Sequence, residues 1–461
     1  MATDVLVFVP GVLGSELWDA GGRLWPGSIW DAIAGFDDAK FARLLAPGLE
    51  ARDIVRSAAG GLVAVYEPWV DAFEAIRRGG LQPFAENPAG GKTKTLYVFP
   101  YDWRLDITAT AQMFADHLDG ILGSVADADV KLVCHSMGGL VARYYLESGA
   151  FDQRPAFSRV SLLVTFGTPH NGATVAYAGA VGLHKTSFLS MDQTRQMAND
   201  PRYPSLYQMF PAPSHSFLWH DDPAQAWKTF PVDDPAIVAR YGLGASSLQA
   251  WRTFRAGLTG AKGTVRYFYI VGSRQETLTR LHWDGNDLRR FELDDAGDGT
   301  VPLPGALDLA VQCEFVGKSH ASLIETRPAR ETLAGLFGGT TVLAAAHVGA
   351  TLAVRDLVVS VEDAVHVQIE FVPEVSRFAG HLSFERADLP AAGTALTGTE
   401  QFVGVGFLPA IPVELNSDGI SYLNLKTKPM QFAGVYRPVL TGEGMPPIVG
   451  PSFVAQREQP L

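Results

Sequence analysis

Six short runs of apolar residues are spaced along most of the chain. They lie at residues 5–9, 95–99, 130–134, 160–166, 265–271 and 310–316. Each run is almost continuously apolar and does not alternate with polar residues, which is the pattern of strands covered on both faces. Loops and segments with helical spacing separate the runs. The pattern therefore predicts an α/β fold built around a mostly parallel sheet.

The pattern changes near residue 340. Short runs in which apolar and polar residues alternate follow one another there, separated by Pro, Gly, Asn and Asp. Such runs are typical of strands with one face on a core, and their spacing predicts a compact all-β sandwich or barrel. We therefore expect two domains, at residues 1–340 and 341–461. The role of the second domain is not indicated by its sequence.

A long segment separates the fourth and fifth apolar runs. It has about one hundred residues, more than an ordinary crossover connection needs. Its stretch "PSLYQMFPAPSHSFLWH" at 204–220 places large apolar side chains beside prolines. This predicts a cap over a site, inserted at about 174–260. A plain helical insertion with a small core of its own explains the pattern nearly as well.

Composition narrows the class of protein. The 461 residues are 47% hydrophobic and 19% charged, as in a globular protein. The net charge of −12 and the lack of a dense Lys/Arg run argue against a nucleic-acid partner. No secretory signal or membrane-spanning run is visible, and Cys134 and Cys313 both lie in strand-like runs, where we expect buried free thiols. A cytoplasmic location is expected, with any membrane contact peripheral.

The third apolar run ends in a turn that carries a serine. The stretch "VKLVCHSMGGLVARYYLE" at 130–147 begins as a strand and ends as an amphipathic helix. A serine at a bend is usually a cap or turn residue. A strand-to-helix turn with small residues two positions before and after Ser136 is also the setting of a nucleophile elbow. Here these residues are Cys134, in place of the usual glycine, and Gly138, and we expect the turn to form.

An aspartate and a histidine follow Ser136 in the chain order of a hydrolase triad. Asp298 lies in "DDAGDGTVPL" and His320 in "GKSHASLIE", each in a loop beyond a later strand. Taken singly, the first is an ordinary turn aspartate and the second an ordinary loop histidine. Together they predict catalysis in which His320 takes the proton of Ser136 and Asp298 orients the imidazole.

Two backbone amides are predicted to bind the oxyanion. Met137 begins the helix after the serine, where its N–H is free of the helical ladder. The second donor is expected from Val12, in the loop after the first strand, where Gly11 and Gly14 allow a close approach of the backbone. Each such donor typically contributes about 3–4 kcal/mol of transition-state stabilisation.

Several motifs occur together in one order along the chain. They are "FVPGVLGSELW", "PYDWRLD" (100–106), "CHSMGGLVARYYLE", "TFGTPHNGA" (165–173), "PSLYQMFP" and "GDGTVPL". From about residue 5 to residue 325 the chain thereby resembles the lecithin:cholesterol acyltransferase family, which includes lysosomal phospholipase A2 and phospholipid:diacylglycerol acyltransferases. The resemblance implies an α/β-hydrolase fold with cap and lid, a triad of Ser136, Asp298 and His320, and acyl-enzyme chemistry on ester lipids. The C-terminal β-domain lies outside it.

Further residues of these segments have predicted roles outside the triad and the oxyanion donors. Asp102 and Arg104 are interpreted as a structural ion pair beneath the site. Five apolar side chains are predicted to contact the substrate or to belong to the cap: Leu13, Trp25, Tyr101, Phe210 and Trp219.

The sequence thus predicts a serine-dependent lipid acyl hydrolase or O-acyltransferase that acts on glycerophospholipids or related ester lipids. A general lipase or esterase, and a non-catalytic hydrolase scaffold that binds a partner, are the alternatives. No cofactor is expected, and no metal site, because Asp294, Asp295 and Asp298 lack a recognisable ligand spacing. For the β-domain we expect attachment to a carbohydrate or membrane surface, a protein partner, or self-association.

Overall fold

A parallel sheet forms the centre of the protein. The structure is a computed structural model that describes residues 2–79, 81–225, 227–341, 349–391, 396, 400–442 and 445–457. The six strands lie in the order β16-β13-β10-β9-β1-β8, and every pair is parallel. They are β1 (Thr3–Val9), β8 (Leu96–Val98), β9 (Ala128–His135), β10 (Val160–Phe166), β13 (Arg266–Gly272) and β16 (Gln312–Val316). Each coincides with one of the six apolar runs, so the predicted fold class is confirmed.

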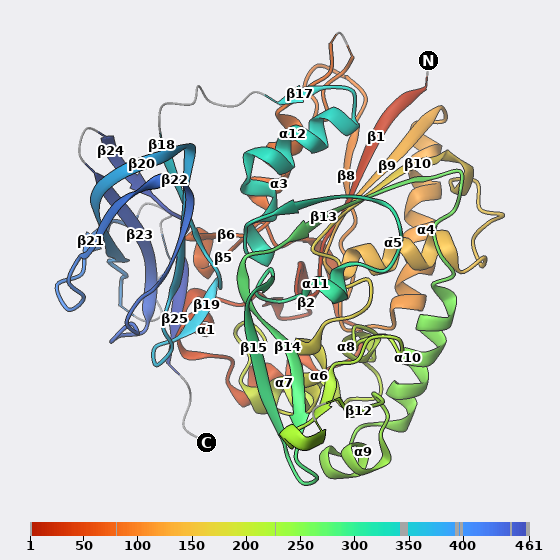
Figure 1. Ribbon diagram of the computed structural model, residues 1–461. Coiled ribbons are helices and arrows are strands. Elements are labelled where there is room, and N and C mark those ends of the chain that lie inside the picture. Colours follow the sequence, from red (N-terminus) through yellow and green to blue (C-terminus); the bar gives the residue numbers. More distant parts are fainter. Residues whose placement is uncertain are drawn as a thin grey trace.

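Both faces of this sheet are covered, which explains why its strands are continuously apolar. Successive side chains of β1 point to opposite faces, and Val7 and Phe8 belong to two different buried clusters. The cluster of Val7 includes residues of α4 (Ile107–Ser124) and α5 (Met137–Glu147). The cluster of Phe8 includes residues of α3 (Glu67–Glu74) and α12 (Arg327–Leu336). Figure 1 shows the helices on the two sides of the sheet.

Short elements fill the segment between the first two strands of the sheet. Helices α1 (Ile29–Ala34) and α2 (Asp38–Leu44) lie here with α3. The strands are β2 (Ser15–Asp19), β3 (Gly22–Trp25), β4 (Glu50–Ile54), β5 (Ser57–Ala58), β6 (Val63–Ala64) and β7 (Ile76–Arg77). Strands β3, β2 and β4 form one small sheet, and β5 pairs with β6.

A second layer is built from two separate parts of the chain (Figure 1). The segment after β10 contains α6 (Thr174–Ala180), α7 (Met191–Ala198), α8 (Ser205–Gln208), β11 (Leu218–His220), β12 (Thr229–Phe230), α9 (Pro235–Tyr241) and α10 (Ala245–Gly257). The hairpin of β14 (Gln275–Trp283) and β15 (Leu288–Gly297) joins it, because β14 pairs with β11 in a mixed sheet of order β12-β11-β14-β15. The layer therefore extends beyond residue 260, the end expected for the cap.

The C-terminal part is all-β, as predicted. After β17 (Thr340–Thr341), which pairs with β7, an eight-stranded sheet follows. Its strands are β18 (Gly349–Val354), β19 (Val358–Ser360), β20 (His366–Ala387), β21 (Phe402–Gly404), β22 (Ile411–Lys426), β23 (Gly434–Gly442), β24 (Met445–Val449) and β25 (Phe453–Gln456). The long strand β20 spans two of the predicted runs and pairs with β18, β21, β22 and β23. Figure 1 shows this sheet in blue beside the α/β part.

The two cysteines are free thiols, but only one is buried as expected. Cys134 lies on the central strand β9 and is fully buried, and burial raises the pKa of its thiol well above the ordinary value. Cys313 is exposed because β16 is the edge strand of the sheet and is only partly covered. The prediction that Cys313 is buried is therefore wrong. Among the described residues, no helix has both the length and the apolar character needed to span a membrane.

Candidate active site

The serine of the strand-to-helix turn occupies a strained backbone conformation. Ser136 lies between β9 and α5 with φ 54° and ψ −127°, which a residue with a side chain rarely adopts. Three hydrogen bonds hold it: its N–H donates to Phe166 O at 2.9 Å, and its carbonyl accepts from Thr168 Oγ1 at 2.9 Å and from the Gly139 N–H at 3.0 Å. A Cβ at Gly138 would overlap the Val9 carbonyl, so the turn requires glycine there.

Asp298 and His320 form a hydrogen-bonded pair. His320 Nδ1 lies 2.7 Å from Asp298 Oδ2, and the His320 N–H donates to the Asp298 carbonyl at 2.9 Å. The other carboxylate oxygen accepts the N–H groups of Thr300 and Val301 at 2.9 and 2.7 Å. Asp298 is only 1% exposed, so these bonds fix its orientation inside the protein. The two loops, distant in sequence, are brought together as predicted.

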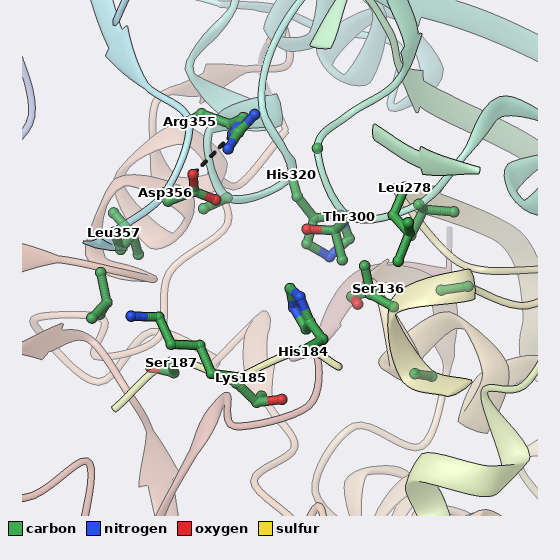
Figure 2. A pocket seen from close by; sticks show the side chains of 18 of the residues that line it. Ser136, His184, Lys185, Ser187, Leu278, Thr300, His320, Arg355, Asp356 and Leu357 are labelled. Carbon is green, nitrogen blue, oxygen red and sulfur yellow. Dashed lines mark hydrogen bonds and ion pairs between the residues drawn. The ribbon is translucent and has the colours of Figure 1, made fainter. Parts of the chain in front are cut away.

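The pairing determines the tautomer of His320. A carboxylate oxygen accepts and cannot donate, so Nδ1 carries the proton and Nε2 presents its lone pair. Ser136 and His320 line one cavity, and Figure 2 shows the two side chains near each other in it. The structure gives no hydrogen bond between these two side chains. Such a bond is often long without substrate and shortens when substrate binds.

The loop after β1 lies directly against the serine. A Cβ added to Gly11 would approach Ser136 Cβ to 2.8 Å, so only glycine permits this contact. The Gly11 N–H already donates to Tyr66 Oη at 2.9 Å. Within the described residues the Val12 N–H has no hydrogen-bond partner, and Val12 lines the cavity. Met137 is the first residue of α5, so its N–H precedes the helical ladder. Both predicted donors are therefore free to bind an oxyanion.

A buried network beneath this loop was not foreseen from the sequence. His135 Nε2 lies 3.0 Å from the His320 carbonyl, which can only accept, so Nε2 is the protonated nitrogen. His135 Nδ1 then accepts the hydroxyl proton of Tyr66 at 2.7 Å. Burial holds the pKa of His135 well below its ordinary value, which keeps the ring neutral. One chain of bonds thus joins Gly11, Tyr66, His135 and His320. The apolar neighbourhood of His135 gave no signal of it.

The cavity has a volume of about 660 Å³ and an amphipathic lining. Val12, Leu13, Leu206 and Leu278 are among its apolar residues, and Lys185, Glu276, Arg290 and Arg355 are among its charged residues. His184, from the segment after β10, also lines it (Figure 2). Its Nδ1 lies 3.1 Å from Arg290 Nη1, a donor, so the ring is neutral. Burial, followed by the charge of Arg290, lowers the pKa of His184 to about 4.

Of the five residues predicted to contact substrate or to form the cap, only Leu13 lines the cavity. Trp25 and Tyr101 are buried behind the loop and donate hydrogen bonds to Leu13 O and Pro10 O at 2.8 Å each. They hold the loop from behind. Phe210 is buried against Tyr177 and Tyr207, and Trp219 lies on β11 beside Arg280. Trp25 and Tyr101 thus support the loop, whereas Phe210 and Trp219 lie in the inserted segment after β10, within the range expected for the cap. Sequence alone does not distinguish packing from lining.

The expected ion pair of Asp102 and Arg104 is confirmed. Arg104 Nη2 lies 2.6 Å from Asp102 Oδ2, and Arg104 Nε donates to Asp102 Oδ1 at 2.8 Å. Arg104 also donates to the carbonyl groups of Leu44 and Ala46. Its side chain is fully buried, so it ties separate loops together behind the site.

The chain is distantly similar to several solved structures. Lipase BlEst2 of Bacillus licheniformis, in its mature form, is 15% identical, and the match covers 73% of this chain and 91% of that chain with a TM-score of 0.32. The product of gene lin2722 from Listeria innocua is 12% identical, covering 72% and 92%, with a TM-score of 0.30. A search of curated proteins finds no match.

A sequence model described as "Lecithin:cholesterol acyltransferase" matches residues 45–234. This range contains Ser136, the 100–106 stretch and the 165–173 stretch, and it ends before Asp298 and His320. The resemblance inferred from the motifs is therefore confirmed over residues 45–234, which is less than half of the chain.

Proposed function

We propose that the protein is a serine-dependent acyl hydrolase or O-acyltransferase acting on ester lipids. The observation that carries this proposal is the Asp298–His320 pair, which leaves the Nε2 lone pair of His320 in the cavity that Ser136 also lines. The strained backbone at Ser136 supports it, because such strain is common where a side chain must be presented for chemistry. The family match supports an ester lipid as substrate.

The chemistry proceeds in two halves. Ser136 Oγ attacks the ester carbonyl carbon while His320 Nε2 takes the hydroxyl proton, and Asp298 stabilises the imidazolium. The N–H groups of Met137 and Val12 bind the oxyanion. The tetrahedral intermediate then expels the alcohol, which receives the proton from His320 and leaves an acyl group on Ser136. Water or a second alcohol repeats these steps in reverse and releases the acyl group.

The amphipathic cavity supports an amphipathic ester. The apolar side chains of the lining suit an acyl chain, and its charged side chains suit the polar end of the substrate. A glycerophospholipid or a related ester lipid has both parts. The acceptor depends on whether an alcohol is held beside the acyl-enzyme while water is excluded.

The test compares the protein with Ser136→Ala on fluorogenic acyl esters of different chain length. Because Ser136 is the proposed nucleophile, we expect the substitution to lower kcat by at least about 10⁴-fold. A fluorophosphonate should add to Ser136 of the unsubstituted protein, as seen by peptide mass spectrometry. Equal turnover by the two proteins, or labelling at a residue other than Ser136, would disprove the proposal.

The substrate class and the acceptor are tested together. The protein is incubated with mixed phospholipids and a long-chain alcohol, and products are identified by mass spectrometry. Free fatty acid indicates transfer to water, and a new ester of the added alcohol indicates acyl transfer. If the protein hydrolyses simple esters but forms neither product from phospholipids, phospholipids are not its substrate and the proposed substrate becomes another class of ester.

A further inference from the structure

The C-terminal sheet reaches the cavity that contains Ser136. Residues 355–359, which connect β18 to β19 and begin β19, line this cavity. Figure 2 shows Arg355, Asp356 and Leu357 across the cavity from Ser136. The wall that they add is charged at Arg355 and Asp356 and apolar from Leu357 onward. Part of the space available to substrate is thus bounded by a region outside the matched family range.

The same sheet supports the loop that carries His320. Lys318 Nζ lies 3.3 Å from Glu370 Oε2 on β20, and the Lys318 side chain is only 3% exposed. A buried ammonium group needs a carboxylate partner, because the protein interior solvates charge poorly. Ser319 Oγ donates to the Val354 carbonyl at the end of β18, at 3.3 Å. The two residues directly before His320 are therefore both bonded to the C-terminal sheet.

The loop of Asp298 also contacts this sheet. A Cβ added to Gly299 would approach Arg355 Cγ to 3.1 Å, so the Arg355 side chain packs closely against the backbone of Gly299. Arg355 Nη1 lies 3.3 Å from Glu276 Oε2 on β14, and its Nε donates to Asp356 at 2.8 Å. His366 and Lys426 also approach Glu276, at 3.9 Å each. Three basic side chains of the C-terminal part thus converge on one carboxylate of the hairpin beside the site.

We propose that the C-terminal sheet contributes to both catalysis and substrate binding at the acyl-ester site. Glu370, acting through Lys318, positions the loop of His320, and residues 355–359 form the wall against which the substrate packs. The inference rests on the proposed function and extends it, since it assigns positioning and substrate contact to a region that carries none of the reacting groups. It also requires that an amphipathic ester contacts Leu357.

The positioning role is tested with Glu370→Gln in the full chain. The matched control is Glu385→Gln on the same strand, which breaks the 2.7 Å pair with Arg437 within the sheet. The two glutamates have side chains 26% and 28% exposed, but Lys318 is 3% exposed and Arg437 is 30% exposed. Glu370→Gln should therefore lower stability more, and kcat is compared at a temperature where both variants are folded. Because a displaced base slows chemistry more than binding, we expect Glu370→Gln to lower kcat about tenfold with KM nearly unchanged. Fluorophosphonate labelling of Ser136 should slow in proportion.

Glu370→Asp, which keeps the charge, should recover part of the lost kcat. If Glu370→Gln matches Glu385→Gln in kcat and in labelling rate, the positioning role is disproved. If the unsubstituted protein is itself inactive and unlabelled, the proposed function fails and this inference fails with it. Activity of the unsubstituted protein therefore separates the two failures.

The wall is tested with Leu357→Trp, which places a larger side chain at a position that lines the cavity. Its control is Val403→Trp on β21, where Val403 is 53% exposed. We expect Leu357→Trp to raise KM for long-chain esters several-fold more than for short-chain esters, because the cavity becomes smaller. Labelling of Ser136 by a small fluorophosphonate should be unchanged. The same chain-length profile for both variants would show that substrate does not contact this wall.

Discussion

The two large sheets of the protein contribute to the site in different ways. In the central sheet all pairs are parallel, so the carboxyl ends of its strands meet at one edge. The loops of Val12, Ser136 and His320 follow β1, β9 and β16 at this edge, and the loop of Asp298 follows β15 of the neighbouring mixed sheet. Four segments thus supply the proposed reacting groups. In the C-terminal sheet the strands around β20 are antiparallel, and this part of the chain lines the cavity with residues 355–359, 363–364, His366 and Lys426.

This difference suggests distinct roles for the two sheets: the parallel sheet positions proposed reacting groups, and the C-terminal sheet supports their loops. The parallel sheet holds three of the proposed reacting groups on short loops that follow its strands. Asp298 is fixed by hydrogen bonds with Thr300, Val301 and His320. The antiparallel sheet has no comparable convergence of strand ends, so it acts through packing and ion pairs against those loops. Substitutions at the loops of the parallel sheet should therefore change the rate far more than substitutions in the C-terminal sheet.

The largest expected contrast is at Asp298. The change Asp298→Asn keeps the shape and the Oδ1 acceptor of the two backbone N–H groups, but an amide nitrogen cannot accept from His320 Nδ1. The imidazole then favours the wrong tautomer, and kcat should fall about 10⁴-fold. Steady-state kinetics measure this, with Glu385→Gln in the C-terminal sheet as control. A loss below tenfold would mean that Asp298 does not orient the base.

A smaller contrast is expected between two tyrosines. Tyr66→Phe removes the hydroxyl that joins Gly11 to His135, which loosens the loop of Val12. We expect kcat to fall about tenfold, since one oxyanion donor is misplaced but not lost. The free energy of unfolding should fall by about 1–3 kcal/mol, because the buried Gly11 N–H loses its acceptor.

The control is Tyr436→Phe in the C-terminal sheet, which breaks the 2.7 Å bond from Tyr436 Oη to the Phe432 carbonyl. It should lower stability and leave kcat unchanged. Urea unfolding and ester hydrolysis on the same samples separate the two effects. Equal kcat for the two variants would contradict a role of the Tyr66 network in the site.

The smallest contrast concerns acid stability. Burial lowers the pKa values of His117 and His184 to about 4, and burial also lowers those of His135 and His170. These histidines bind protons more weakly in the folded than in the unfolded state. Between about pH 6.5 and pH 4 the unfolded chain therefore takes up more protons, and the free energy of unfolding falls as the pH is lowered.

All four of these histidines lie in the α/β part, so acid should destabilise that part more than the C-terminal sheet. Hydrogen exchange followed by mass spectrometry at pH 6.5 and pH 5 reports each part separately, after correction for the intrinsic exchange rate. His184→Gln should flatten the pH dependence around the cavity. Equal acid sensitivity of the two parts would contradict this expectation.

Comparing the edge and the centre of the parallel sheet shows how far a local run of apolar residues predicts whether a side chain is buried. The apolar runs located all six strands, because a strand covered on both faces must be continuously apolar. The same reasoning failed at Cys313, since the order of strands across the sheet makes β16 an edge. Likewise, the sequence predicts that Trp25 and Tyr101 contact the substrate or belong to the cap. Only their hydrogen bonds show that they support the loop and do not line the cavity.

The sequence by itself determined the strands, the small residues of the turn at Ser136, and the order of serine, aspartate and histidine along the chain. These are properties of neighbouring residues, whose spacing and size decide local backbone conformation. The tertiary structure decided what meets across the cavity: the pairing of Asp298 with His320, the Tyr66–His135 network, and the contact of Lys318 with Glu370. Such contacts join residues far apart in the chain, so they depend on how sheets pack and not on local pattern.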